Sequence, residues 1–115
     1  MQYMLLINFD ETGMPANADT ARMSPAYVAY TEAMQKAGVL VGGDRLVSSK
    51  AAKRIRVRDG KAVVLDGPFT DTVEQLGGYY IIDVPTIDAA VEWAGKCPTA
   101  ETGTIEVRPV WQYSN

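Results

Sequence analysis

Two short runs of this chain are apolar at nearly every position, so strands built from them would bury both faces. They are YMLLINF at residues 3–9 and GGYYIIDV at residues 77–84. Runs this short and this rich in strand formers are typical of strands rather than of helices. A sheet centred on such strands needs cover on both sides. Helices of the same chain supply one cover, and the other must be a second sheet or a ligand.

Helical periodicity occurs twice. Ser24 is an N-cap candidate before Pro25, and an apolar stripe at spacings of three and four then runs to Gly38. Thr86 is the N-cap candidate of a second helix with the same kind of stripe, which ends at Cys97-Pro98. We therefore predict helices over residues 25–37 and 87–96.

Further strands are predicted between and after these helices. Residues 39–47 form a strand that Gly42-Gly43 interrupts, and residues 104–110 form an edge strand that contains Pro109. Residues 53–58 and 62–65 flank Asp59-Gly60, a pair typical of a type I′ hairpin turn. Residues 10–23 are rich in Gly, Pro, Asn and Asp, which indicates a polar loop.

The resulting order is strand, helix, strand, hairpin, strand, helix, strand. Two strand–helix–strand units predict an α+β, ferredoxin-like antiparallel sheet with two helices on one face. At 115 residues the chain has the length of a single domain, residues 1–115. The uncovered apolar sheet face predicts a homodimer of the dimeric α+β barrel type, and a ligand on that face is the alternative.

Charge and hydropathy exclude several classes of partner. The chain has 11 Lys and Arg against 14 Asp and Glu, a net charge of -3, so we expect no nucleic-acid binding. No stretch approaches the roughly 20 apolar residues of a membrane span, so we expect no membrane insertion. No basic residue precedes the first apolar run, as a signal peptide would require, and we expect a cytoplasmic protein.

The chain has no histidine and a single cysteine, Cys97. These two counts exclude an internal disulfide, a Ser-His-Asp or Cys-His triad, and histidine-based zinc or iron sites. We therefore expect neither a metal nor a cofactor. Any catalysis must use Asp, Glu, Tyr, Lys, Arg or Cys97, and Cys97 itself is predicted to be a core residue rather than a nucleophile.

Two carboxylates are the candidate catalytic residues. Asp66 begins the turn D-G-P-F, and Glu74 follows eight residues later. At the mouth of a cleft the two could share a proton or hold a polar substrate. In the alternative, Asp66 anchors the turn by accepting backbone hydrogen bonds, and Glu74 is a capping or solvated residue.

Four further residues are candidates for ligand binding. Asp44 and Arg45 follow the glycine break, Phe69 lies in the same turn as Asp66, and Arg108 lies in the last strand. Arg108 would need a carboxylate partner if it faced the sheet, and Asp66 or Glu74 would be the first candidates. A second basic group, Arg54, Arg56 and Arg58, shares one strand face, which we interpret as a solvated edge ribbon rather than an anion site.

The motifs Asp66-Gly67-Pro68-Phe69 and Glu74-Gln75-Leu76-Gly77-Gly78-Tyr79 resemble those of the DGPF-domain proteins, a branch of the YCII-related family. The similarity runs from YMLLI at the start to IEVRPVW at the end. It implies a ferredoxin-like fold that dimerises through its sheets. Many such proteins are encoded near extracytoplasmic-function sigma factors, so the resemblance also implies a sigma-type regulator as an alternative partner.

Better understood YCII relatives have been proposed to use a His near the start of the first helix and an Asp at the end of the second. By position these fall at Tyr27 and Cys97, and neither residue matches. The resemblance therefore leaves two hypotheses. One is a small-molecule-binding or carboxylate-based enzyme site, and the other is a non-enzymatic dimer that interacts with a regulator.

Overall fold

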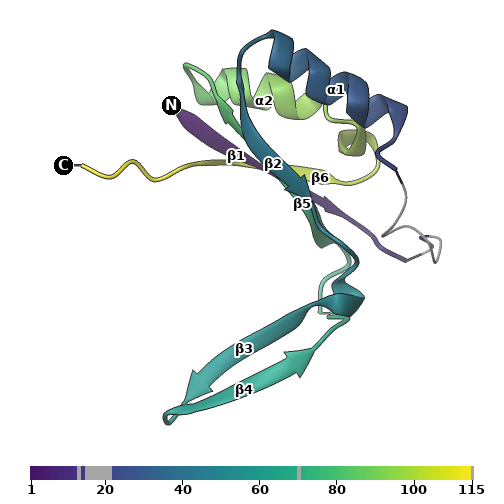
Figure 1. The fold of residues 1–115 in the computed structure, drawn as a ribbon, viewed down its shortest axis with the longest axis vertical. Coiled ribbons are helices and arrows are strands. Elements are labelled where there is room, and N and C mark those ends of the chain that lie inside the picture. Colours follow the sequence, from purple (N-terminus) through teal and green to yellow (C-terminus); the bar gives the residue numbers. More distant parts are fainter. Residues whose placement is uncertain (13, 15–21, 70, 115) are drawn as a thin grey trace.

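A computed structural model of the chain describes residues 1–12, 14, 22–69 and 71–114. Figure 1 shows a sheet with two helices on one face and a long hairpin that projects from the body. The strands are β1 (Gln2–Phe9), β2 (Leu40–Arg45), β3 (Lys53–Arg58), β4 (Lys61–Asp66), β5 (Gln75–Asp83) and β6 (Thr104–Pro109). The α-helices are α1 (Pro25–Lys36) and α2 (Ile87–Gly95), and short 3₁₀ helices are η2 (Ser49–Ala51) and η3 (Pro98–Glu101).

The main sheet has four antiparallel strands in the order β2-β5-β1-β6. With α1 after β1 and α2 after β5, this is the ferredoxin-like arrangement that the sequence predicted. The strand predicted to be at an edge, β6, lies at one end of the sheet. The sheet is open in the described part of the chain and does not close into a barrel. No helix among the described residues is long and apolar enough to cross a membrane.

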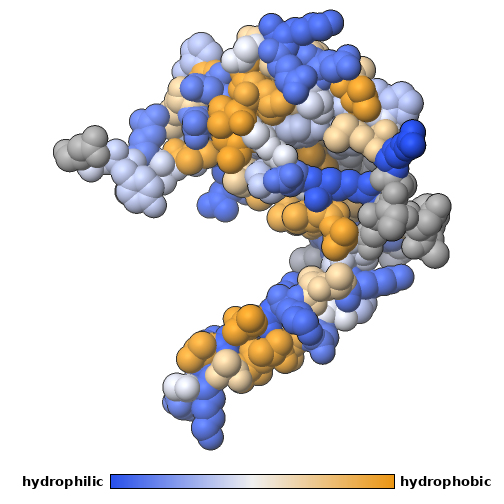
Figure 2. All heavy atoms as spheres, in the orientation of Figure 1, coloured by the Kyte–Doolittle hydropathy of each residue, from blue (hydrophilic) through white to orange (hydrophobic). Residues whose placement is uncertain are grey.

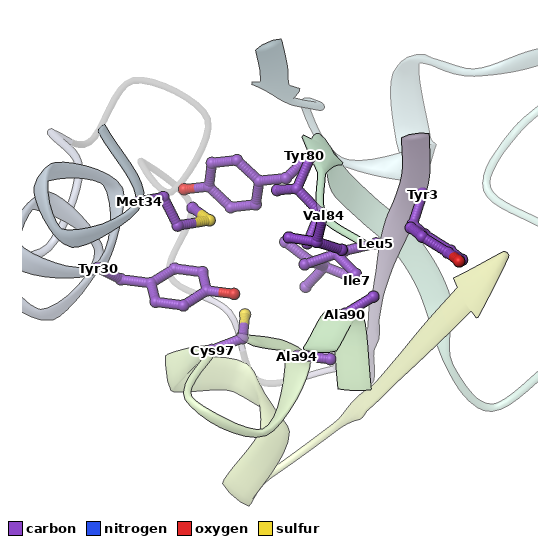
Figure 3. Close-up of a cluster of buried hydrophobic side chains, with 11 residues drawn as sticks. Tyr3, Leu5, Ile7, Tyr30, Met34, Tyr80, Val84, Ala90, Ala94 and Cys97 are labelled. Carbon is purple, nitrogen blue, oxygen red and sulfur yellow. The ribbon is translucent and has the colours of Figure 1, made fainter. Parts of the chain in front are cut away.

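The core lies between the helices and one face of the sheet (Figure 3). Alternate residues of β1 and β5 point to it, and register places Leu5 opposite Tyr80. Leu5, Met34 and Ile82 have no exposed side-chain surface. Cys97 is 2% exposed and belongs to this core, as predicted. The remaining buried members are Tyr3, Ile7, Tyr30, Tyr80, Val84, Ala90 and Ala94.

The helix boundaries follow the predicted caps. The Ser24 hydroxyl accepts a hydrogen bond from the Tyr27 amide, and the Thr86 hydroxyl accepts one from the Ala89 amide. Gly38, just after α1, has a φ of 74°, a conformation that glycine adopts without a steric penalty. The helices end one residue earlier than predicted, at Lys36 and Gly95. The next residues, Ala37 and Lys96, are the C-caps, whose positions apolar periodicity indicates only approximately.

Strand boundaries differ more. The strand predicted over residues 39–47 extends from Leu40 to Arg45, and one backbone hydrogen bond continues at each end, at the Val39 carbonyl and the Leu46 amide. β5 begins at Gln75, two residues earlier than predicted, because its first residues pair with the end of β1. The interruption predicted at Gly42-Gly43 is present in β2 as a register shift between Leu40 and Gly42. The loop predicted over residues 10–23 lies largely outside the described residues.

A second register shift, between Ile7 and Asn8, has a packing cause that the sequence did not reveal. The Phe9 ring lies where a side chain on Gly77 would be. A Cβ atom built there would be 1.9 Å from a ring carbon. Glycine at position 77 therefore lets the aromatic ring approach the strand backbone.

The hairpin β3–β4 forms a separate two-stranded sheet. The turn residues Asp59 and Gly60 both have positive φ, 52° and 73°, as the predicted type I′ turn requires. Every residue of both strands is exposed. Residues 53–66 are called the arm below.

Candidate functional site

A cleft of about 700 Å³ lies between α1 and the sheet, where β2 and β5 meet the end of β1. Its walls come from α1, from both strands and from η3, so elements distant in sequence build one concave surface. The residues that line it are Ile7, Phe9, Asp10, Arg22, Met23, Ser24, Tyr27, Thr31, Gln35, Leu40, Gly42, Gly43, Asp44, Arg45, Gly77, Gly78, Tyr79, Tyr80, Thr99 and Thr102.

Glycines shape the strand wall of the cleft. A Cβ atom on Gly42 would have no atom within 4 Å, but register with Ile81 directs this position to the helix-free side of the sheet. Gly43 and Gly78 differ, because a Cβ atom there would come within 2.5 Å and 3.0 Å of the neighbouring strand's backbone. Gly43 and Gly78 therefore let the backbones of β2 and β5 lie close together, with no side chain of their own on the side that faces α1.

Tyr27 brings a hydroxyl into the cleft from the first turn of α1. Its oxygen lies 3.3 Å from the Cys97 sulfur and 2.5 Å from the Thr99 hydroxyl. These are the two positions, 27 and 97, that the family resemblance singled out as His and Asp slots. Burial, followed by the hydrogen bond with Cys97, raises the pKa of Tyr27 above its usual value. The phenol is therefore held neutral and acts as a hydrogen-bonding group, not as a base.

Two more hydroxyls lie one turn further along α1 and on the facing strand. Thr31 and Tyr80 share a hydrogen bond of 2.8 Å between their hydroxyls. Burial raises the pKa of Tyr80, so this phenol is also neutral. Tyr27, Thr31, Tyr80 and Thr99 together give the cleft hydrogen-bonding groups from three elements.

The predicted ligand residues Asp44 and Arg45 both line the cleft. Register places Arg45 opposite Gly78, on the helix side of the sheet. Asp44 pairs with Tyr79 on the other side and accepts a hydrogen bond from the Tyr79 hydroxyl at 3.2 Å. Of the two neighbours, Arg45 is therefore the one whose side chain belongs to the wall facing α1.

Asp66 and Phe69 lie elsewhere, at the base of the arm. Asp66 is the last residue of β4 and forms an exposed ion pair with Lys53, which is directly opposite it in the hairpin. The Arg54 guanidinium lies 3.9 Å from the Phe69 ring centre and donates two hydrogen bonds to Asp71. The Asp66 carboxylate thus faces a cation across the strand pair, and its role as a turn anchor stays a prediction.

Glu74 and Arg108 are also apart from the cleft. Glu74 is half-buried just before β5, and its backbone carbonyl accepts a hydrogen bond from the Thr72 hydroxyl. Arg108 is exposed on β6 and pairs with Glu106 at 3.5 Å, neither of the two partners considered from the sequence. It lines a second hollow, of about 680 Å³, beside Met4, Leu6 and Trp111. Among the described residues that line the cleft, none of Asp66, Phe69, Glu74 and Arg108 is present.

Sequence reasoning missed Thr31, Gln35 and Thr99 as cleft residues. Thr31 and Gln35 follow Tyr27 at spacings of four, so a polar stripe along α1 was the available signal. Thr99 had no such signal, because only the return of the chain after α2 brings it to Tyr27. Within the described ranges no three His, Cys, Asp or Glu side chains gather as metal ligands would.

Two comparisons with known proteins bear on this chain. A family model of the YCII-related domain matches residues 1–114. An uncharacterised protein of Rhizobium meliloti (strain 1021) is 36% identical over 117 residues, which span 98% of this chain and 94% of that protein. Both matches cover the main sheet, the cleft and the arm.

Proposed function

The chain belongs to the family of YCII-related domain proteins, and we propose that it binds a small polar molecule in the cleft between α1 and the sheet. The family predicted from the D-G-P-F motif is thereby confirmed. The observation that carries the proposal is the cleft itself, which is lined by the hydroxyl-bearing residues Tyr27 and Thr31 of α1 and Tyr80 of β5. A concave site with an apolar lining and a few convergent polar groups is the usual form of a ligand pocket.

The charge at the cleft favours an acidic ligand. Arg45 belongs to the strand wall that faces α1, and Arg22 also lines the cleft. The two carboxylates that line the cleft have partners in the chain: Asp10 accepts hydrogen bonds from the backbone amide and hydroxyl of Thr12, and Asp44 accepts one from the Tyr79 hydroxyl. A carboxylate or similar group on the ligand would pair with Arg45, because a planar guanidinium binds two acceptor oxygens at once.

The rest of the ligand would be apolar or aromatic. Ile7, Phe9 and Leu40 give the cleft an apolar floor. The neutral phenols of Tyr27 and Tyr80 would then donate hydrogen bonds to the ligand or accept them from it. We therefore infer a small acid with an apolar body as the ligand class.

A carboxylate-based reaction is the extension of this proposal that the sequence suggested. Asp66 and Glu74 lie outside the cleft wall, and the Asp66 carboxylate faces Lys53. A catalytic role for the two carboxylates stays a prediction, and its test is turnover of a bound ligand. If Asp66→Asn or Glu74→Gln lowered turnover while leaving ligand affinity unchanged, that role would be supported.

The binding proposal is tested by thermal-shift measurements with matched pairs of aromatic carboxylic acids and their neutral amides. A ligand at 100 times its Kd raises the free energy of unfolding by roughly 2.7 kcal/mol, which is readily seen as a higher melting temperature. We expect the acids to stabilise the protein and the amides to be weaker, because only the acids offer a charge to Arg45.

Two variants and one control locate the binding site. Arg45→Gln should remove the preference for acids, and Thr31→Val should weaken both members of each pair. Arg58→Gln is the matched control, because Arg58 lies at the tip of the arm, where its side chain donates a hydrogen bond to the neighbouring Val57 carbonyl. Equal stabilisation of wild type, Arg45→Gln and Thr31→Val by every ligand would contradict the proposal.

The regulator-binding dimer remains the alternative function. Its test is co-purification of the chain with a regulator of the sigma-factor type. A complex at micromolar concentration, together with no response to any acid, would favour this alternative over ligand binding.

A further inference from the structure

The arm has two open strand edges. In the part of the chain that the structure describes, β3 and β4 pair only with each other. Ile55 is 66% exposed, Val57 61% and Val64 53%. Figure 2 shows hydrophobic residues gathered along the arm, away from the body of the molecule. A two-stranded hairpin is at best marginally stable in water, so a third strand beside the arm would stabilise it.

The alternation of hydrogen bonds identifies the backbone groups that face outward. The Gly67 amide donates to the Ala52 carbonyl at 2.7 Å, one step beyond the first strand pair, Lys53 with Asp66. Along antiparallel strands, hydrogen-bonded pairs alternate with pairs whose backbone groups point away from the partner. Counting from Ala52 and Gly67, the residues of the arm with outward amides and carbonyls include Ile55 and Val57 in β3, and Ala62 and Val64 in β4.

One contact agrees with this count. The Val57 carbonyl accepts a hydrogen bond at 3.0 Å from the guanidinium of the neighbouring Arg58. A carbonyl bonded to the facing strand would not be open to this side chain on the outer edge. The outer edge of β3 therefore offers the donors and acceptors that an additional strand uses.

Register divides the arm into two faces. Directly opposed residues of an antiparallel pair point the same way, which places Ile55 with Val64 and Val57 with Ala62. We call these four residues the apolar arm face. The basic side chains lie on the other face and include Arg54, Arg56, Arg58 and Lys61. A strand beside β3 would therefore meet apolar side chains on one face and arginines on the other.

The base of the arm is fixed in place before any partner binds. The Glu11 carboxylate accepts hydrogen bonds from the backbone amide and the hydroxyl of Ser49, in η2 before β3. The Arg54 guanidinium lies over the Phe69 ring and pairs with Asp71. The D-G-P-F motif thus helps to hold β3 in an extended conformation. A pre-organised edge lowers the ordering cost of binding a further strand.

The charge of β3 determines the chemistry of the strand that can lie beside it. β3 holds four Lys and Arg and no acidic residue, whereas β4 holds one residue of each sign. Lys53 and Arg54 each pair with an aspartate. Within the described ranges, neither Arg56 nor Arg58 forms an ion pair with a carboxylate. These two arginines are therefore available to acidic side chains of a partner.

An added strand places every second side chain beside these arginines. Opposite charges on neighbouring strands stabilise a sheet, and like charges destabilise it. The partner strand therefore needs acidic residues at alternate positions. Its other side chains lie beside Ile55 and Val57, where apolar β-branched residues pack well. A second copy of β3 is disfavoured in this position, because it would bring arginine beside arginine.

We propose that β3 binds an extended segment of another protein as a third strand of the arm, and that acidic and apolar residues alternate in this segment. The acidic side chains pair with Arg56 and Arg58, and the backbone of the segment pairs with that of Ile55 and Val57. Main-chain hydrogen bonds give such strand addition its affinity, and the alternate side chains give it specificity. No arm residue is among the described residues that line the cleft, so strand addition is independent of ligand binding there.

A synthetic peptide tests the chemistry of the partner. A short capped peptide of alternating glutamate and valine, with a fluorophore at one end, is titrated with the full chain and followed by fluorescence anisotropy. The matched peptide has lysine in place of glutamate. We expect the glutamate peptide to bind at least about 10-fold more tightly, because each charge pair beside an arginine changes from favourable to unfavourable. Equal affinity of the two peptides, or no binding of either, would overturn the proposal.

N-methylated peptides separate strand pairing from simple charge attraction. In an added strand, only one alternate set of amides faces β3. Methylation of the valine amides in one peptide and of the glutamate amides in another leaves every charge in place. We expect one of the two peptides to lose binding and the other to stay within a few-fold of the unmethylated peptide. Equal affinity of the two methylated peptides would contradict strand addition.

Two opposed residues of the arm identify the edge that is used. Ile55→Pro removes an outward amide of β3, and Val64→Pro removes the outward amide of the residue directly opposite, in β4. Neither amide bonds to the facing strand, and proline is tolerated at such edge positions. We expect Ile55→Pro to abolish binding of the glutamate peptide and Val64→Pro to leave it within a few-fold. The reverse order, or equal effects, would overturn the assignment of the site to β3.

A charge substitution gives the same information without proline. Arg56→Glu should weaken binding of the glutamate peptide by about 10-fold or more, because an acidic row would then lie beside an acidic side chain. Lys61→Glu is the matched control, because it makes the same change of charge on the same face but in β4. A peptide attracted only by the net charge of the arm would respond equally to both substitutions, and that result would contradict the proposal.

Hydrogen exchange locates the added strand on the wild-type chain. In the free protein the amides of Ile55 and Val57 face solvent and should exchange rapidly, whereas the Arg56 amide faces β4 and should exchange more slowly. Saturation with the glutamate peptide should slow exchange at Ile55 and Val57 by about 10-fold or more. Unchanged exchange at these two amides while the peptide is bound would overturn the proposal.

Discussion

The hydroxyl oxygen of Tyr27 lies 3.3 Å from the sulfur of Cys97, although 70 residues separate them in the chain. Tyr27 is in the first turn of α1, and Cys97 immediately precedes η3. The contact links α1 to the segment that follows α2. Tyr27 also lines the cleft. Stability and the candidate binding site thus depend on one side chain.

Tyr27→Phe removes this hydroxyl while keeping the ring. The Thr99 hydroxyl loses its partner, and we expect the free energy of unfolding to fall by about 1 kcal/mol. Urea denaturation measures the change. Tyr113→Phe is the control, because Tyr113 is 88% exposed and its substitution should have no effect. A loss as large as that of a deleted core side chain would indicate that the ring itself moves.

Stability should fall at alkaline pH. Burial raises the pKa of Tyr27, Tyr30 and Tyr80 above the value of about 10 that they have in the unfolded chain. The folded state holds these protons more tightly, so the stabilisation is complete below pH 10 and is lost as the pH rises beyond it. Urea midpoints between pH 9 and pH 11.5 should decline, and the decline should be shallower in Tyr30→Phe.

Met34→Ala should be strongly destabilising. Met34 is fully buried between α1 and the sheet, so its truncation leaves a cavity and loses apolar contacts. We expect a loss of about 2–5 kcal/mol in the free energy of unfolding. Met23→Ala, at a residue 49% exposed, should change it by no more than about 0.5 kcal/mol. Equal effects of the two substitutions would contradict the location of the core.

Gly77→Ala should be destabilising although the new side chain is a single methyl group. That group would lie within contact distance of the Phe9 ring, which must move, and we expect a cost of about 1–3 kcal/mol. Gly42→Ala is the matched control, since its methyl group meets open space. Adding Phe9→Leu should reduce the cost of Gly77→Ala, and a double-mutant cycle in urea would measure this coupling.

The local features of the fold could be predicted from particular residues. Ser24 and Thr86 mark the helix starts, and Asp59-Gly60 marks the hairpin, because each acts on backbone atoms within three residues of itself. The order of these elements then predicted the ferredoxin-like sheet. The candidate site was predicted less well. Arg45 lines the cleft, whereas Asp66 and Phe69 fix the arm.

The reason for this difference is physical. Apolar periodicity, caps and turns are local properties, so the sequence by itself determined the elements, their order and the need to cover both sheet faces. Distances between remote side chains depend on how these elements pack. Only the tertiary structure could bring Tyr27 to Cys97, direct Asp66 toward Lys53, and separate the arm from the cleft. Those contacts form between residues that share no local pattern in the chain.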